Sequence, residues 1–92
     1  MALTCVDLNT LRKYLDYVDH RILKYIEKRQ QLARQIGMVK KASEKPIEDP
    51  TRFQQVVMDR IEVGTRRGIS EDCIITIWNA LHEEALRIER ES

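Results

Sequence analysis

Arg29 is a charged residue on a stripe of the sequence where apolar residues are expected. The residues before and after it are apolar at every third or fourth position, which is the spacing of one helix face, and Arg29 fills the slot between Tyr25 and Leu32. An ionised guanidinium against apolar surface is costly unless it is paired, and its planar fork of donors suits a carboxylate or a phosphate. The stripe therefore indicates either a structural ion pair or a site for a small anionic molecule among helices.

Two more cations belong to the same helical pattern. Lys40 follows Arg29 by eleven residues, so the two share a face and lie ~16 Å apart along the axis. This spacing leaves room for a small molecule, although Lys40 also fits a solvated helix end. Arg12 is ~25 Å from Arg29 along the axis. Arg12 is therefore either exposed or part of a site in another copy of the chain.

Two acids and one further arginine complete the candidate site. Asp49 and Arg52 stand at a predicted helix start, where the positive end of the helix favours anions. Glu89 follows Trp78 by eleven residues, so it is expected to face inward. The alternative reading makes Asp49 a simple cap and Glu89 a surface charge near a fraying end.

The elements that must position these residues are three helices. We predict a first helix from about residues 7–9 to Ala42, a second that Asp49 caps and Gly68 ends, and a third that Ser70 caps. Gly37 lies inside the first helix, where it marks either a close approach of another backbone or ligand or a break. The charged residues 87–92 are expected to fray.

Composition restricts the class of protein. The chain has 92 residues, a net charge of +1, 42% hydrophobic and 34% charged residues, which fits one all-α domain over residues 1–92. The charge predicts no nucleic-acid partner, and no apolar run suits a membrane span. His20 and His82 lack the spacing of metal ligands, so no metal is expected. Cys5 and Cys73 are expected to be free thiols, and the protein cytoplasmic.

The length of the first helix predicts an oligomer. A helix of ~35 residues is ~52 Å long, whereas a compact chain of this size has a radius of gyration near 12 Å. The helix would overhang its own domain and expose apolar surface. We therefore expect an intertwined homodimer with antiparallel long helices, in which Arg12 reaches the site of the other subunit.

The motifs resemble one known family. The stretches 27–29, 32–33 and 36–40, together with 46–52, read Glu-Lys-Arg, Leu-Ala, Ile-Gly-Met-Val-Lys and Pro-Ile-Glu-Asp-Pro-Thr-Arg. They resemble the all-helical chorismate mutases, and the similarity runs from about residue 7 to residue 89. It implies an intertwined dimer of three-helix subunits that rearranges chorismate to prephenate without a cofactor.

The resemblance also implies residue roles. Arg29 and Arg12 from the partner would hold the two substrate carboxylates, and Lys40 would bind the ether oxygen and a carboxylate. The Asp49 region would meet the C4 hydroxyl, and Arg52 would organise that end. The implied catalytic residues are Lys40, Glu89 and Arg29, and the implied substrate-binding residues are Arg12, Arg29, Lys40, Asp49, Arg52, Phe53, Ala85 and Glu89.

Three positions differ from the family pattern. Phe53 stands where a Glu usually meets the hydroxyl, Ala85 where many members have Ser, and Glu89 where many have Gln. A carboxylate would repel the ether oxygen, so Glu89 can donate only when it is protonated. Phe53 favours the related isochorismate-pyruvate lyases, and a mutase for 4-amino-4-deoxychorismate is a further variant. Loss of the Glu and the Ser would also suit a non-catalytic helical regulatory dimer.

Overall fold

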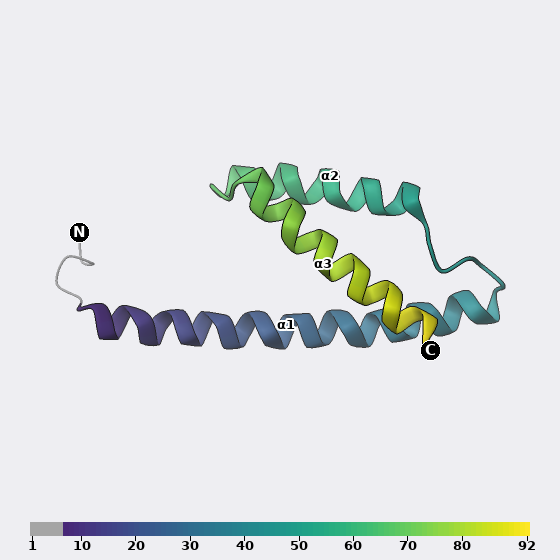
Figure 1. Ribbon diagram of the computed structural model, residues 1–92, viewed down its shortest axis with the longest axis horizontal. Helices are drawn as coiled ribbons and strands as arrows, with labels where there is room; N and C mark the ends of the chain where they lie inside the picture. The colour runs from purple at the N-terminus through teal and green to yellow at the C-terminus, as the bar shows by residue number, and fades with distance from the viewer. Residues whose placement is uncertain (1–6) are drawn as a thin grey trace.

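The chain is all-helical in its described part. The computed structural model describes residues 7–92, so Cys5 lies outside the described residues. Three helices follow one another along the chain, α1 (Leu8–Ala42), α2 (Pro50–Arg66) and α3 (Glu71–Arg90), and residues 7–92 contain no strand (Figure 1). Cys73 is an exposed free thiol. None of these helices combines the length and apolarity needed to cross a bilayer.

Local capping fixes where each helix begins. The side chains of Asp7, Asp49 and Ser70 each accept a hydrogen bond from the backbone amide three residues further on, which satisfies one of the free amides at each helix start. Pro50 occupies the first turn of α2, where a missing amide hydrogen costs nothing. These are the helix starts that the sequence predicts.

A glycine turn joins α2 to α3. Gly68 has φ +81°, a conformation that residues with a Cβ rarely adopt. The amide of Ile69 donates to the carbonyl oxygen of Gly64 across this turn, as at many helix ends that close with glycine. The predicted stop at Gly68 is confirmed.

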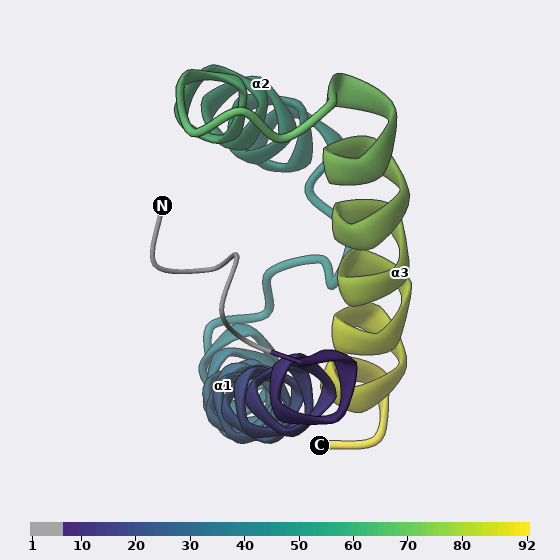
Figure 2. The same cartoon turned by 90° about the vertical axis from the view of Figure 1, so that its left-hand side faces the viewer.

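Helix α3 connects the other two helices. It packs against α1 through its C-terminal half and against α2 through its N-terminal half, whereas α1 and α2 do not pack on each other (Figures 1 and 2). The small buried core follows these two contacts, and Ile74 is its most enclosed member. The space between α1 and α2 is consequently bridged only by α3.

Gly37 sets the distance between α1 and α3. The helix continues through it without a break, and a Cβ at this position would lie 2.8 Å from the Cα of Glu89. Contacts that short do not occur between real Cβ atoms and backbone, so glycine is required for this approach. Of the two alternatives for Gly37, the close approach is therefore confirmed and the break is wrong.

The prediction that residues 87–92 fray is wrong. Helix α3 extends to Arg90, and Ile88 and Glu89 are buried. Arg87 forms ion pairs with Glu84 and Glu91. The close packing on Gly37 holds this end of α3 in place, which charge composition alone does not reveal.

The N-terminal half of α1 extends beyond the rest of the chain (Figure 1). The molecule measures 58 × 24 × 15 Å, with a radius of gyration of 17.1 Å instead of the ~12 Å of a compact chain of this length. The apolar stripe of α1 is exposed along its whole length in the single chain, and so is Ile77 on the predicted stripe of α3. The exposed stripe comprises Leu11, Leu15, Val18, Ile22, Tyr25, Leu32, Ile36 and Val39.

Candidate functional site

All three helices and the loop before α2 line one pocket. Its volume is about 490 Å³, enough for a small organic molecule. The polar residues of its wall are mostly charged, with cations contributed by both α1 and α2. The lining residues are Arg29, Leu32, Ala33, Ile36, Lys40, Ile47, Asp49, Arg52, Phe53, Val56, Arg60, His82, Ala85, Leu86 and Glu89.

The structure brings the candidate residues of the sequence together around this pocket, with one exception. Arg12 lies in the overhanging part of α1, is exposed, and does not line the pocket. Its distance along α1 prevents it from serving this pocket within one chain, as the helical spacing predicts. The other candidates come from α1, α2 and α3 and meet only because α3 crosses between the first two helices.

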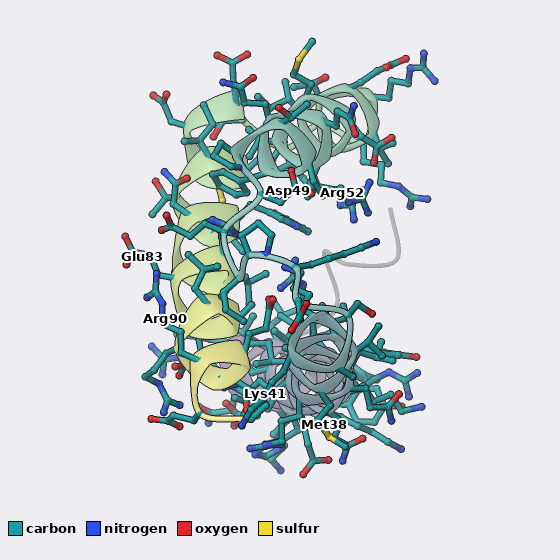
Figure 3. All side chains as sticks on the ribbon, turned by 90° about the vertical axis from the view of Figure 1, so that its right-hand side faces the viewer. Met38, Lys41, Asp49, Arg52, Glu83 and Arg90 are labelled. Atoms are coloured by element: carbon teal, nitrogen blue, oxygen red, sulfur yellow. The ribbon has the colours of Figure 1, made fainter. Side chains whose placement is uncertain are left out.

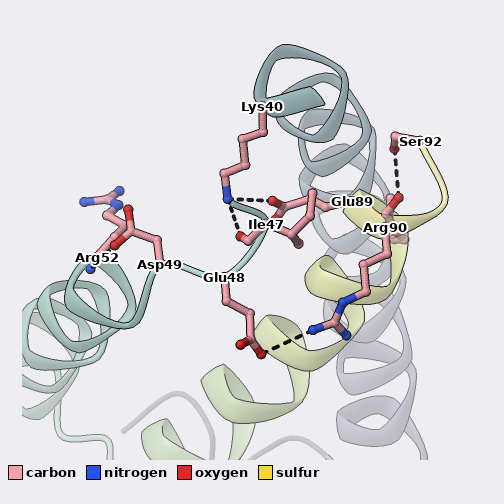
Figure 4. A network of polar contacts seen from close by, with 9 residues as sticks. Lys40, Ile47, Glu48, Asp49, Arg52, Glu89, Arg90 and Ser92 are labelled. Atoms are coloured by element: carbon pink, nitrogen blue, oxygen red, sulfur yellow. Dashed lines mark hydrogen bonds and ion pairs between the residues drawn. The ribbon is translucent and has the colours of Figure 1, made fainter. Parts of the chain in front are cut away.

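Lys40 and Glu89 form an ion pair at one end of the pocket. The Lys40 Nζ lies 2.7 Å from Glu89 Oε1, and it also donates to the carbonyl oxygen of Ile47 at 2.6 Å (Figure 4). The Glu89 side chain is only 9% exposed and that of Lys40 21%. A pair this enclosed is held in one geometry, and its ammonium points toward the pocket from which a ligand would approach.

Asp49 and Arg52 occupy the start of α2 at the same end. Both lie on the side of α2 that faces α1, whereas Glu83 and Arg90 lie on the outer side of α3 (Figure 3). Asp49 Oδ1 accepts from the Arg52 amide at 3.1 Å, so Asp49 is a cap as well as a pocket residue. One of its carboxylate oxygens is thereby fixed, and the other is available to a ligand.

Arg29 has no anionic partner within residues 7–92. No hydrogen bond or ion pair of the described chain reaches its guanidinium. Burial, together with repulsion from Arg60, lowers the pKa of Arg29 from its ordinary value. The described residues therefore do not support a structural ion pair, and the pocket favours an anion beside Arg29.

Phe53 and His82 form a stacked pair in the wall between α2 and α3. Their ring centroids lie 3.7 Å apart, with an interplanar angle of 12°. Burial lowers the pKa of His82 from its ordinary value, the charge of Glu89 opposes this effect, and the charge of Arg29 adds to it. The imidazole is therefore neutral near pH 7, and the stack presents an uncharged aromatic surface to a ligand.

Sequence reasoning missed two polar residues of the pocket, His82 and Arg60. A signal existed for each: His82 follows Trp78 by four residues, and Arg60 follows Val56 by four, so each shares a helix face with an expected core residue. No group of three or more potential metal-ligating side chains occurs in the described part of the chain.

The arrangement can bind a small dianion. Arg29 and Arg60 supply positive charge at one end, and Lys40 and Arg52 supply it about three turns of α1 away. Fixed cations at two ends orient an extended or folded dianion, and they stabilise negative charge that develops between them. Fold and pocket together define an all-helical protein with a cationic pocket that suits a small dianion.

Comparison with known proteins identifies the family. The family described as "Chorismate mutase type II" matches residues 11–90. A protein named chorismate mutase from Methanocaldococcus jannaschii is 34% identical over 83 residues, which cover 87% of this chain and 83% of the relative. The chain therefore belongs to the type II chorismate mutase family and is an isomerase of that family.

Proposed function

We propose that this isomerase rearranges chorismate to prephenate in the pocket between its three helices, as a step in the biosynthesis of aromatic amino acids. The observation that carries the proposal is the convergence of Arg29, Lys40 and Arg52 on one small pocket. Chorismate has two carboxylates and an ether oxygen, and these are the groups that such cations bind. The family match provides independent support.

In this proposal Lys40 and Arg29 make the main contacts with substrate. Arg29, which has no anion within residues 7–92, holds one carboxylate. Lys40 donates to the ether oxygen and to the second carboxylate, while the carbonyl of Ile47 and the carboxylate of Glu89 keep its ammonium in place. Asp49 accepts from the ring hydroxyl, and Arg52 supports that end of the site.

Catalysis follows from position and electrostatics. The rearrangement breaks a C–O bond and forms a C–C bond within one molecule, so the site must hold the two reacting ends together. Negative charge develops on the ether oxygen as the C–O bond lengthens. Lys40 is a fixed donor for that charge, and a fixed donor stabilises it without reorganisation during the reaction.

The proposal includes a homodimer. The exposed apolar stripe on α1 needs cover, and an antiparallel copy of α1 would supply it along the length of the helix. The same packing would carry Arg12 of the partner subunit toward Lys40 and Arg29. The second carboxylate would then be held by residues of both subunits.

The decisive experiment is an NMR time course of the purified protein with chorismate at about pH 5.5 and about pH 8. The expected result is conversion to prephenate by the wild type and a loss of at least ~100-fold in kcat/KM for Arg29→Ala. Arg34→Ala removes an exposed arginine of the same helix and serves as the matched control. Absence of turnover at both pH values would contradict the proposal.

One observation favours isochorismate as a second candidate substrate. The Phe53–His82 stack puts an aromatic wall, without a carboxylate, in the part of the pocket next to Asp49. A ring without a C4 hydroxyl would suit this wall. Incubation with isochorismate and detection of released pyruvate tests the candidate, and pyruvate release with no prephenate from chorismate would make the chain an isochorismate-pyruvate lyase.

A further inference from the structure

Arg60 extends the cationic face of α2 along the pocket. Arg52, Val56 and Arg60 are four residues apart, so they share one helix face, with Arg60 ~12 Å beyond Arg52 along the axis. All three line the pocket. Because α2 runs antiparallel to α1 (Figure 1), Arg52 lies near the Lys40 end and Arg60 near the Arg29 end.

The two guanidiniums at this end repel each other. The charge of Arg60 is close enough to lower the pKa of Arg29. Arg29 has no anionic partner within residues 7–92, and Arg60 is paired only with Asp59, its neighbour in sequence, at 2.6 Å. The Asp59 side chain is 56% exposed, and an exposed pair of this kind contributes little. Two cations that face one cavity are stable together when an anion lies between them.

The acids near the Arg29 end are already paired or distant. Glu84 lines a second, smaller pocket with Arg29, but it is paired with Arg87. The two pocket acids lie elsewhere, because Glu89 is bound to Lys40 and Asp49 is ~16 Å from Arg60 along α2. The anion for this end must come from a ligand or from another chain.

We infer that Arg60 is a substrate-binding residue that holds, together with Arg29, one carboxylate of the dicarboxylate substrate. The inference rests on the proposed function and adds to it a second guanidinium from α2. The pocket then contacts one carboxylate through α1 and α2 at the Arg29 end and the other at the Lys40 end. A monocarboxylate would lose one of these two sets of contacts, so Arg60 contributes to selection of dianions.

Arg60→Gln with Arg66→Gln as a matched control tests the inference. Arg66 is a 74% exposed arginine of the same helix, paired with Glu62. We expect Arg60→Gln to raise KM for chorismate by about 10-fold to 100-fold, the range for a lost hydrogen bond to a charged group. We expect Arg60→Lys to recover part of the loss, and Arg66→Gln to resemble the wild type. Circular dichroism and thermal unfolding of each variant check that it is folded.

The variant Asp59→Asn distinguishes a substrate-binding role of Arg60 from a structural role. If Arg60 acts only through its pair with Asp59, Asp59→Asn will reproduce the defect of Arg60→Gln. If Arg60 binds substrate, Asp59→Asn will leave KM unchanged or lower it, because the guanidinium is released toward the pocket. Equal KM values for Arg60→Gln and Arg66→Gln in an active enzyme would overturn the inference alone. A wild type that does not turn over chorismate would overturn the proposed function instead.

Discussion

Glu89 is a charged residue of the candidate site whose side chain is buried. Its carboxylate is enclosed and bound to Lys40 at 2.7 Å, yet the proposed reaction needs a donor, and not a carboxylate, beside the ether oxygen. A carboxylate near that oxygen would repel the charge that forms there in the transition state. A neutral amide at this position would supply a donor without repelling that charge.

This contrast gives a prediction about substitution. We expect Glu89→Gln to raise kcat/KM for chorismate several-fold, because an amide donates to the ether oxygen where a carboxylate repels its developing charge. The amide carbonyl can still accept from Lys40. Rates measured for both proteins at one pH test this, and an unchanged or lower rate for Glu89→Gln would contradict it.

His82 gives a prediction about stability. Its pKa in the folded chain is lowered from 6.5, mainly by burial, so the unfolded chain binds this proton at higher pH than the folded chain does. The contribution of neutral His82 to the free energy of unfolding is thus fully present above about pH 6.5. It is lost as the pH falls toward the pKa of His82 in the folded chain. We expect the wild type to lose more stability than His82→Gln between about pH 7.5 and about pH 5.5 in urea unfolding.

The matched control for this measurement is His20→Gln. His20 lies exposed on α1, so its replacement should leave the pH dependence of stability as in the wild type. Equal losses in the wild type and in His82→Gln would show that burial of His82 does not disfavour its charged form.

At the scale of the elements, the contact between α1 and α3 depends on Gly37. A Cβ there would lie 2.8 Å from both Cα and the carbonyl oxygen of Glu89, and neither backbone atom can rotate away. Overpacking typically costs about 1–3 kcal/mol, against a gain of ~1 kcal/mol in helix propensity for Gly→Ala. We expect Gly37→Ala to lose up to about 2 kcal/mol of stability in urea unfolding.

Gly37→Ala should also reduce activity, because Glu89 and its partner Lys40 would move apart. Gln35→Ala, at an exposed position of the same helix, is the control and should remain close to the wild type in both respects. A Gly37→Ala protein as stable as the Gln35→Ala protein would mean that α3 can shift at little cost.

The sequence predicts the elements well where their chemistry is local. Asp7, Asp49 and Ser70 are recognisable caps, and all three act as such. The end of α3 could not be predicted from its charged composition, because its order comes from contact with Gly37, which lies far away in sequence.

The same distinction applies to the site. Arg29 and Lys40 share a face of one helix, so periodicity alone places them together. Periodicity places Arg60 and His82 on the faces of α2 and α3 that carry core residues. It does not report the rotation of these helices relative to α1, which brings both side chains to the pocket. The resemblance could not supply them either, since its motifs do not include these two positions.

At the scale of the whole molecule, the proposed dimer divides each site between two chains. Arg12 and Arg29 of one chain would serve different sites, so Arg12→Ala and Arg29→Ala should each be inactive. A dimer with one chain of each kind would have one site with both arginines and one with neither.

Mixing the two inactive proteins tests this division. When they are unfolded together in equal amounts and refolded, half of the dimers should be mixed, so activity should recover to about one quarter of the wild-type level. Refolding each protein alone is the control and should give no activity. Failure of the mixture to recover would show that the site does not cross the interface.

The gap between α1 and α2 has a consequence for motion. Since these helices do not pack on each other, only a ligand that contacts Arg29 or Lys40 on one side and Arg52 on the other can join them directly. Bound prephenate would then link α1 to α2 and slow local opening of α2. We expect amide hydrogen exchange in α2 to slow more on adding prephenate than exchange in the α1–α3 contact, and uniform slowing would contradict this.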